Sequence, residues 1–232
     1  MNTRHLQFYI TTETPCSYFA DRKSRNLVPD PAIPLNMPIY NQLIQHGFRR
    51  SGKFSYRPYC NACQACIACR IAVKDFIANR SQQRCLKKNR DLDLTVTRAS
   101  FTEEYFELYR RYLNSRHGEG SMAYPAKEDY ELFLYCNWCD TRFLEFRLNG
   151  HLVAVAVTDF VNDGLSAVYS FFDPELKKRS LGTWCILQQI DYAKQLELEY
   201  VYLGYWVENH SKMHYKINFK PLQLYLDQKW KT

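Results

Sequence analysis

The sequence lacks any hydrophobic run long enough to cross a bilayer. Its longest strongly apolar run covers residues 152–157, whereas a membrane-spanning helix needs about 20 apolar residues. The N-terminal stretch MNTRHLQFYITTETPC also lacks the apolar core of a secretory signal peptide. We therefore expect a cytoplasmic protein with no membrane partner.

Several widespread catalytic motifs are missing as well. The chain contains no GxSxG, GxxxxGKS/T, GxGxxG or HExxH. These patterns supply, in turn, a serine nucleophile, a phosphate-binding loop, a dinucleotide site and a zinc-binding helix. Their absence argues against a serine hydrolase and against nucleotide hydrolysis.

Acidic residues are scarce in the first part of the chain. Residues 1–90 hold 15 Lys and Arg against 4 Asp and Glu, whereas residues 91–232 hold 16 against 20. A basic excess of this kind predicts a polyanionic partner, with nucleic acid as the first candidate. Residues 47–59, GFRRSGKFSYRPY, alternate aromatic and basic side chains, which suits stacking on unpaired nucleotides and contact with phosphates. The alternative is a strand with a solvated, charged face.

Cysteine, by contrast, is abundant. The count of 9 is odd, so complete pairing within the chain is impossible, and cytoplasmic thiols usually stay reduced. Cys60, Cys63, Cys66 and Cys69 recur at every third position, a spacing that on an ideal helix spreads four thiols over about half the circumference. We expect Cys60, Cys63 and Cys66 to join Cys16 around zinc or an iron–sulfur cluster, or to stand as unoccupied thiols. Alternatively, the cysteines are small side chains that pack a loop-rich region.

The pattern of the chain divides it into two regions. Residues 1–89 are rich in proline and turn signals, with a short helix at about 38–46 and a basic helix that begins at Ser81. We expect this region to form a small, basic, cysteine-containing domain.

Residues 90–232 show the element order β-α-α-β-β-β-α-β-α-β. Thr102 is placed to cap a helix, and Asn149-Gly150 is typical of a tight hairpin turn. This order predicts an α+β, GNAT-like acyltransferase domain, in which helices flank a mixed central sheet. The loop RSLGT at 179–183 would then offer N–H groups to a phosphate-bearing donor. It departs from the glycine-rich acetyl-CoA signature, but an acetyl-CoA-dependent N-acyltransferase stays open as an alternative.

A series of short motifs occurs in order along nearly the whole chain: PCSYF, GFRRSG, YRPYCxxCxxC, FxxNRxQxRxLKxN, EEYFxLYRRYxxxRH, LSAVYSFFDP, RSLG and YLGYW…KMHYK. Together they resemble the bacterial branch of the arginyl-tRNA–protein transferase family. The resemblance implies that leucine passes from leucyl-tRNA to the α-amino group of proteins that begin with Asp or Glu, which marks them for degradation as an N-degron. Cys69 is additional to the family pattern, and Phe19 stands where the eukaryotic branch carries a cysteine.

This reaction implies roles for particular residues. Aminolysis of an ester depends mainly on positioning and on stabilising the oxyanion, and no cofactor is required for it. Strand ends offer Tyr169, Ser170 and Tyr205 as catalytic candidates. Candidates for binding the acidic N-terminal residue are Arg70, Arg84, Lys212 and Lys216. Candidates for binding tRNA are Arg57, Lys87, Lys88, Arg179 and Gly182. A non-catalytic, metal-dependent RNA-binding protein is the remaining alternative, and the sequence leaves the oligomeric state open.

Overall fold

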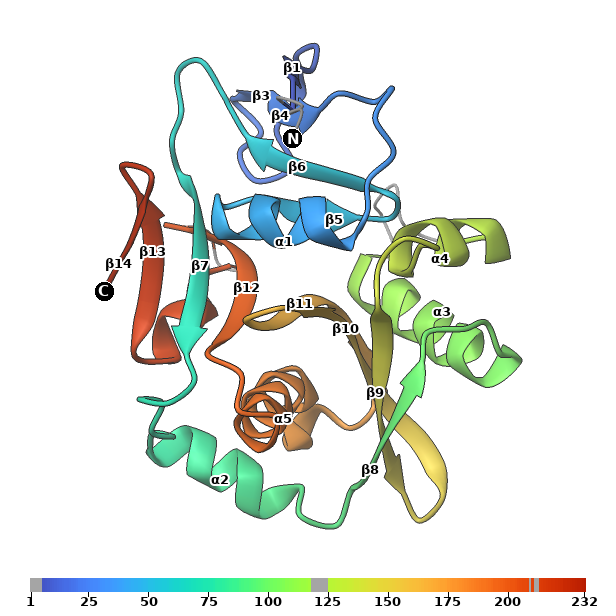
Figure 1. The fold of residues 1–232 in the computed structure, drawn as a ribbon. Helices are drawn as coiled ribbons and strands as arrows, with labels where there is room; N and C mark the ends of the chain where they lie inside the picture. Colours follow the sequence, from blue (N-terminus) through green and yellow to red (C-terminus); the bar gives the residue numbers. More distant parts are fainter. Residues whose placement is uncertain (1–5, 118–124, 209, 211–212) are drawn as a thin grey trace.

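A large mixed sheet forms the centre of the computed structural model, which describes residues 6–117, 125–208, 210 and 213–232 (Figure 1). In the sheet, β11 and β12 are parallel neighbours, whereas the other neighbouring strands are antiparallel. The strands are, in sheet order, β14 (Lys229–Lys231), β13 (Leu222–Leu226), β7 (Cys66–Ala72), β12 (Tyr200–Val207), β11 (Gly164–Phe172), β10 (His151–Val161), β9 (Thr141–Leu148) and β8 (Asp93–Arg98).

Helices cover both faces of this sheet. Helices α3 (Glu103–His117) and α4 (Lys127–Leu134) pack on one face, and α5 (Leu181–Gln195) packs on the other, with α2 (Arg80–Lys88) beside it (Figure 1). Strand β10 is buried on both sides, because Ala154 and Ala156 face the α5 core while Val155 and Val157 face the α3 core. This explains the uninterrupted apolar run at residues 152–157. No helix among the described residues is both long and apolar enough to cross a membrane.

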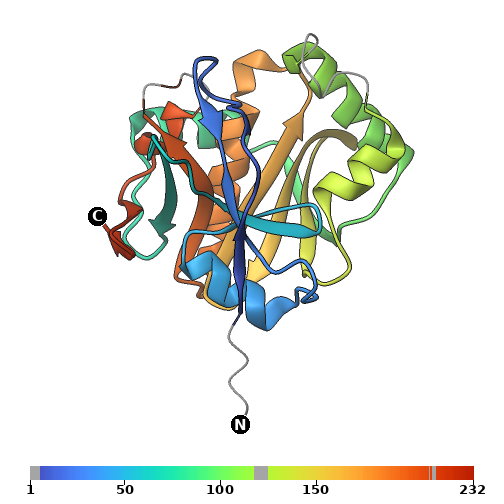
Figure 2. The same ribbon diagram turned by 90° about the horizontal axis from the view of Figure 1, so that it is seen from above.

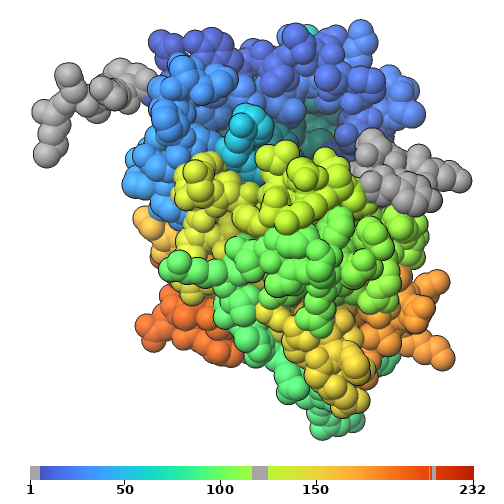
Figure 3. All heavy atoms as spheres, turned by 90° about the vertical axis from the view of Figure 1, so that its right-hand side faces the viewer, coloured from blue at the N-terminus to red at the C-terminus, as the bar shows by residue number. Residues whose placement is uncertain are grey.

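A smaller sheet from the N-terminal segment crosses over the large one (Figure 2). It contains, in order, β1 (Phe8–Ile10), β4 (Asn26–Pro29), β6 (Phe54–Pro58) and β5 (Arg49–Ser51), and the same segment holds α1 (Met37–Gln45) and the short pair β2 (Thr14–Pro15) and β3 (Lys23–Ser24). Two 3-10 turns occur later in the chain: η1 (Lys177–Arg179) lies just before α5, and η2 (His214–Asn218) contacts β12. Its β5–β6 turn meets α4, where the Gly52 N–H donates to the Phe133 carbonyl at 3.1 Å. Figure 3 shows this side of the molecule, with the N-terminal segment packed above α3 and α4.

Local signals predicted most of these elements. The helix expected at about 38–46 is α1, the Thr102 hydroxyl accepts a hydrogen bond from the Tyr105 N–H at 3.2 Å, and Asn149 has the positive φ of a tight turn, 50°. One cap is placed differently. Helix α2 begins after Asn79, which forms a reciprocal capping box with Gln82, and not at Ser81.

Strand β7 is the main element that the sequence pattern missed. Residues 66–72 belong to the cysteine-rich stretch, yet they form a strand between β12 and β13 in the large sheet. The division between 1–89 and 90–232 therefore does not coincide with a division of this sheet. The α+β class, with a mixed sheet flanked by helices, is confirmed. The finer GNAT-like assignment stays a prediction.

Candidate functional site

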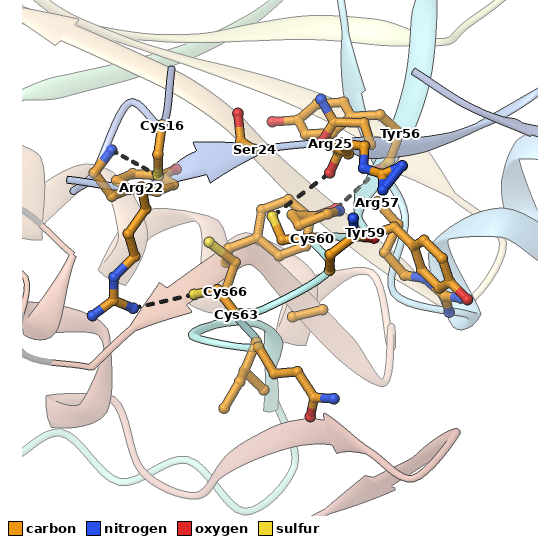
Figure 4. Close-up of a pocket in the computed structure, with 18 of the residues that line it drawn as sticks. Cys16, Arg22, Ser24, Arg25, Tyr56, Arg57, Tyr59, Cys60, Cys63 and Cys66 are labelled. Atoms are coloured by element: carbon orange, nitrogen blue, oxygen red, sulfur yellow. Dashed lines mark hydrogen bonds between the residues drawn. The ribbon is translucent and has the colours of Figure 1, made fainter. Parts of the chain in front are cut away.

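A cavity of about 740 Å³ lies between the N-terminal segment and strands β7 and β12 (Figure 4). This volume is in the usual range for ligand sites. The cavity is strongly basic, since its lining includes four basic side chains and the single carboxylate of Asp227. Its basic residues are Arg22, Lys23, Arg25 and Arg57, and its aromatic residues include Tyr18, Phe19, Tyr56 and Tyr59.

The same cavity collects the four cysteines that the sequence grouped together. Cys16, Cys60, Cys63 and Cys66 all line it. Cys66 is the first residue of β7. Cys69 comes three residues later, on the opposite face of the strand, and is 1% exposed. The structure thus separates Cys69 from the other four.

The thiols of this group differ in their surroundings. The backbone N–H of Ala65 lowers the pKa of Cys63, and so does the Arg22 guanidinium, which donates to Cys63 Sγ at 3.2 Å. Burial and the neighbouring thiols raise the pKa of Cys66 to about 12. Cys63 is therefore the more reactive thiol of the two.

The cysteines do not converge as metal ligands in this arrangement. Within the described part of the chain, no group of three or more His, Cys, Asp or Glu side chains is placed to hold a metal ion. Instead, the Cys16 sulfur accepts from the Tyr18 N–H at 3.4 Å, and the Cys60 thiol points to the Arg25 carbonyl at 3.8 Å. The zinc or iron–sulfur site stays a prediction, and we derive no step of the chemistry from it.

Beside the cavity, the parallel strands β11 and β12 separate. They pair over only three positions, from Gly164 with Tyr200 to Ser166 with Tyr202. Arg49, from β5, lies where the strands have parted: its guanidinium donates to the Val168 carbonyl of β11 and packs against Gly204 of β12. Any β-carbon at position 204 would lie 3.0 Å from Arg49 Nη1, and Gly204 also has a positive φ of 72°. Both observations explain why glycine occupies this position.

A second cation reaches the same segment of β12. The ammonium group of Lys216, from η2, donates to the Tyr205 carbonyl at 2.5 Å, and the residue is only 4% exposed. Burial lowers the pKa of Lys216 to about 8, so the side chain is still largely protonated at neutral pH. Lys216 was expected from the sequence. Arg49 was missed, because in the motif GFRRSG nothing distinguishes it from the structural Arg50.

The three catalytic candidates lie in different environments. The Tyr205 hydroxyl is 2.9 Å from the Tyr56 carbonyl and 3.1 Å from the Gly47 carbonyl, so it joins the two sheets. The Tyr169 hydroxyl is buried without a hydrogen-bond partner among the described residues, and burial raises its pKa. Ser170, the next residue of β11, faces the opposite side. The three side chains do not form one constellation, so their catalytic roles stay predictions.

The remaining binding candidates are also dispersed. Arg70 is 8% exposed, stacks 3.4 Å from the ring centre of Tyr200 and donates to Gln223 at 2.8 Å. Arg84 is exposed on α2, at the opposite end of the molecule from the N-terminal sheet (Figure 1). Lys212 lies outside the described residues. Arg70, Arg84 and Lys216, the three of these cations that the structure describes, therefore do not share one pocket.

The tRNA candidates fall into two places. Arg57 lines the cavity, where it also donates to the His46 carbonyl at 2.8 Å. The other four lie at the junction of α2, η1 and α5. There Arg179 pairs with Asp91 at 2.7 Å, and the Lys88 ammonium donates to the Lys178 carbonyl at 2.6 Å. Lys87 is exposed, and Gly182 is the second residue of α5, where an added β-carbon would lie 3.2 Å from the Phe172 ring.

Comparison with known proteins decides the family. Residues 14–84 match the model for the N terminus of arginine-tRNA-protein transferase, and residues 104–226 match the model for its C terminus. The chain belongs to this family. The resemblance inferred from the motifs is thereby confirmed.

Relatives match over nearly the whole length. The chain is 48% identical over 227 residues to an aspartate/glutamate leucyltransferase of Pseudomonas putida (strain GB-1), covering 98% of this chain and 97% of the relative. It is 46% identical over 231 residues to the protein of the same name from Hahella chejuensis, covering 100% and 99%. Among solved structures, L-PGS from Bacillus licheniformis matches with a TM-score of 0.46 and 12% identity, covering 75% of this chain and 51% of that one. This structural likeness is too low to assign the fold.

Proposed function

We propose that the protein transfers leucine from leucyl-tRNA to the α-amino group of proteins whose first residue is Asp or Glu. The observation that carries the proposal is the 48% identity to an aspartate/glutamate leucyltransferase, which extends over 97% of that relative. The product would begin with leucine and so would carry an N-degron.

The chemistry is aminolysis of an ester. The acceptor's α-amine attacks the carbonyl that joins leucine to the tRNA ribose; an amide bond forms, the ester bond breaks, and the ribose hydroxyl leaves with a proton. An α-amine has a pKa of about 7.7–8.0, so a useful fraction is neutral at physiological pH. The protein then contributes mainly positioning and stabilisation of charge. We expect no cofactor to be required for this step.

The basic cavity is our candidate for the acceptor end of the tRNA. Arg22, Arg25 and Arg57 line it and suit contact with phosphates. Tyr59, which is 50% exposed, offers a ring on which an unpaired base can stack. The exposed basic residues of α2 lie at the far end of the molecule and would contact a different part of the tRNA.

The proposal is tested by transfer of labelled leucine from charged tRNA to synthetic peptides. Peptides that begin with Asp or Glu should accept leucine, and a matched peptide that begins with Ala should not. Leucyl-tRNA should be a better donor than arginyl- or phenylalanyl-tRNA. Acetylation of the peptide from acetyl-CoA without tRNA would favour the N-acyltransferase alternative, and tRNA binding without any transfer would favour a binding protein.

A further inference from the structure

Two cations meet at the Gly204–Tyr205 segment without a carboxylate beside them. Arg49 packs against Gly204, and Lys216 donates to the Tyr205 carbonyl. Neither side chain forms a salt bridge with any carboxylate in the described part of the chain. Arg49 is half-buried, so a ligand can reach it, whereas Lys216 is buried more deeply.

The groups around this pair are neutral at physiological pH. The side chains with the largest electrostatic effect on Arg49 are tyrosines, namely Tyr18, Tyr56, Tyr205 and Tyr215. The acidic groups with the largest electrostatic effect on Lys216 are the thiols of Cys69 and Cys66, whose pKa values burial raises to about 11 and about 12. The site therefore carries two uncompensated positive charges and several hydroxyl groups.

Burial of like charges without a counter-ion costs free energy, so such an arrangement indicates an anion-binding site. We infer that Arg49 and Lys216 together bind the side-chain carboxylate of the acceptor's N-terminal Asp or Glu, which makes them the residues that determine acceptor specificity. This inference rests on the proposed leucyl transfer. Arg49 offers the planar, multi-donor geometry that carboxylates prefer.

The burial of Lys216 favours a carboxylate over a phosphate of the tRNA. A backbone phosphate carries a ribose on each side, so it binds most readily at open basic surfaces such as α2. The Lys216 ammonium, by contrast, belongs to a side chain that is 4% exposed. A terminal carboxylate on a short side chain is small enough to approach a buried ammonium group, and the acceptor's α-amine would then be held only a few bonds away. The place where β11 and β12 part would thus hold the nucleophile in a fixed position.

The test measures kcat/KM for leucyl transfer to matched peptides that begin with Asp or Asn. The wild-type protein should prefer Asp by at least about tenfold, because hydrogen bonds to charged groups discriminate strongly. Arg49→Gln keeps a donor for the Val168 carbonyl but loses the charge. We expect it to lower transfer to the Asp peptide by about tenfold, to leave the Asn peptide within about threefold, and so to remove most of the preference. Lys216→Met should act in the same direction.

Controls separate this effect from misfolding and from tRNA binding. Arg49→Lys keeps the charge and should retain most of the preference for Asp. Arg110→Gln removes an exposed arginine of α3 and should change nothing. Filter binding of leucyl-tRNA and the melting temperature should be nearly unchanged in Arg49→Gln. A wild-type series of Asp, Asn and cysteic acid peptides should rank by negative charge.

The possible outcomes distinguish a failure of this inference from a failure of the proposed function. If wild-type protein transfers leucine and Arg49→Gln keeps the same Asp-to-Asn ratio, the inference is overturned while the proposed function stands. Equal losses for both peptides, together with weaker tRNA binding, would assign the pair to the tRNA instead. No leucyl transfer by the wild-type protein to any peptide would overturn the proposed function and this inference with it.

Discussion

Arg50 and Asp159 form a bidentate salt bridge, with hydrogen bonds of 2.7 and 2.8 Å, in which both side chains are fully buried. The bridge joins β5 of the small sheet to β10 of the large one. Tyr40 and Thr141 donate to the same carboxylate at 3.1 and 2.7 Å. The salt bridge thereby fixes the position of β5, and so of the backbone from which the adjacent Arg49 side chain extends to the gap between β11 and β12.

Asp159→Asn should lower the free energy of unfolding by about 3–5 kcal/mol, because it leaves the buried Arg50 charge without its partner. Urea denaturation followed by circular dichroism measures this change. The matched control is Asp140→Asn, which removes an exposed partner of Arg142 and should cost no more than about 1 kcal/mol. Equal effects of the two substitutions would contradict the anchoring role of Arg50.

Lys216 should make stability depend on pH. Its pKa is lowered to about 8 in the folded protein, below the 10.5 of an unperturbed lysine, so the unfolded chain binds more protons above pH 8. The free energy of unfolding should therefore rise with pH, by about 2 kcal/mol between pH 7 and 9.5 relative to a Lys216→Met variant. Denaturation of both proteins across this range measures the difference. A difference that stays constant with pH would show that Lys216 is not desolvated.

Cys63 should react with iodoacetamide at least about tenfold faster than Cys66, since its pKa is lowered while that of Cys66 is raised to about 12. Mass spectrometry of timed digests measures both rates in one sample. Arg22→Gln should slow the reaction of Cys63 and leave Cys66 unchanged, because only Cys63 accepts a hydrogen bond from Arg22. Faster labelling of Cys66 would contradict this account of the cavity.

A combined Arg84→Ala, Lys87→Ala and Lys88→Ala variant should bind tRNA more weakly while keeping its melting temperature, because exposed charges add little to stability. The slope of log affinity against log salt concentration should fall by up to about 3, if each of the three cations neutralises one phosphate. The measurement is a salt titration of tRNA binding for both proteins. Identical slopes would show that α2 does not contact the tRNA.

Local chemistry explains which parts of the fold could be predicted. The Thr102 cap and the Asn149 turn depend on residues close in sequence, and both were found. Strand β7 was missed because its partners, residues 200–207 and 222–226, lie more than 100 residues away. The cysteine spacing resembled a loop or a helix, although Cys66 begins a strand.

Prediction of the candidate site was limited even more by contacts between residues that are far apart in the sequence. The cysteine group and the basic character of the N-terminal segment could be anticipated from composition and spacing. The role of Arg49 could not, because it depends on where β11 and β12 part and on the space that Gly204 leaves. Strand alternation directs Arg49 and Arg50 to opposite sides, but the sequence does not say which side is the site. For the same reason, Arg70, Arg84 and Lys216, which were grouped by charge alone, are dispersed in the fold.

The most direct measurement of the central claim is mass spectrometry of an Asp-starting peptide after incubation with the protein and leucyl-tRNA. We predict a product that carries one additional leucine, joined through an amide bond to the α-amine, with none formed when that amine is acetylated beforehand. An unmodified peptide, or leucine attached at any other position, would contradict the account.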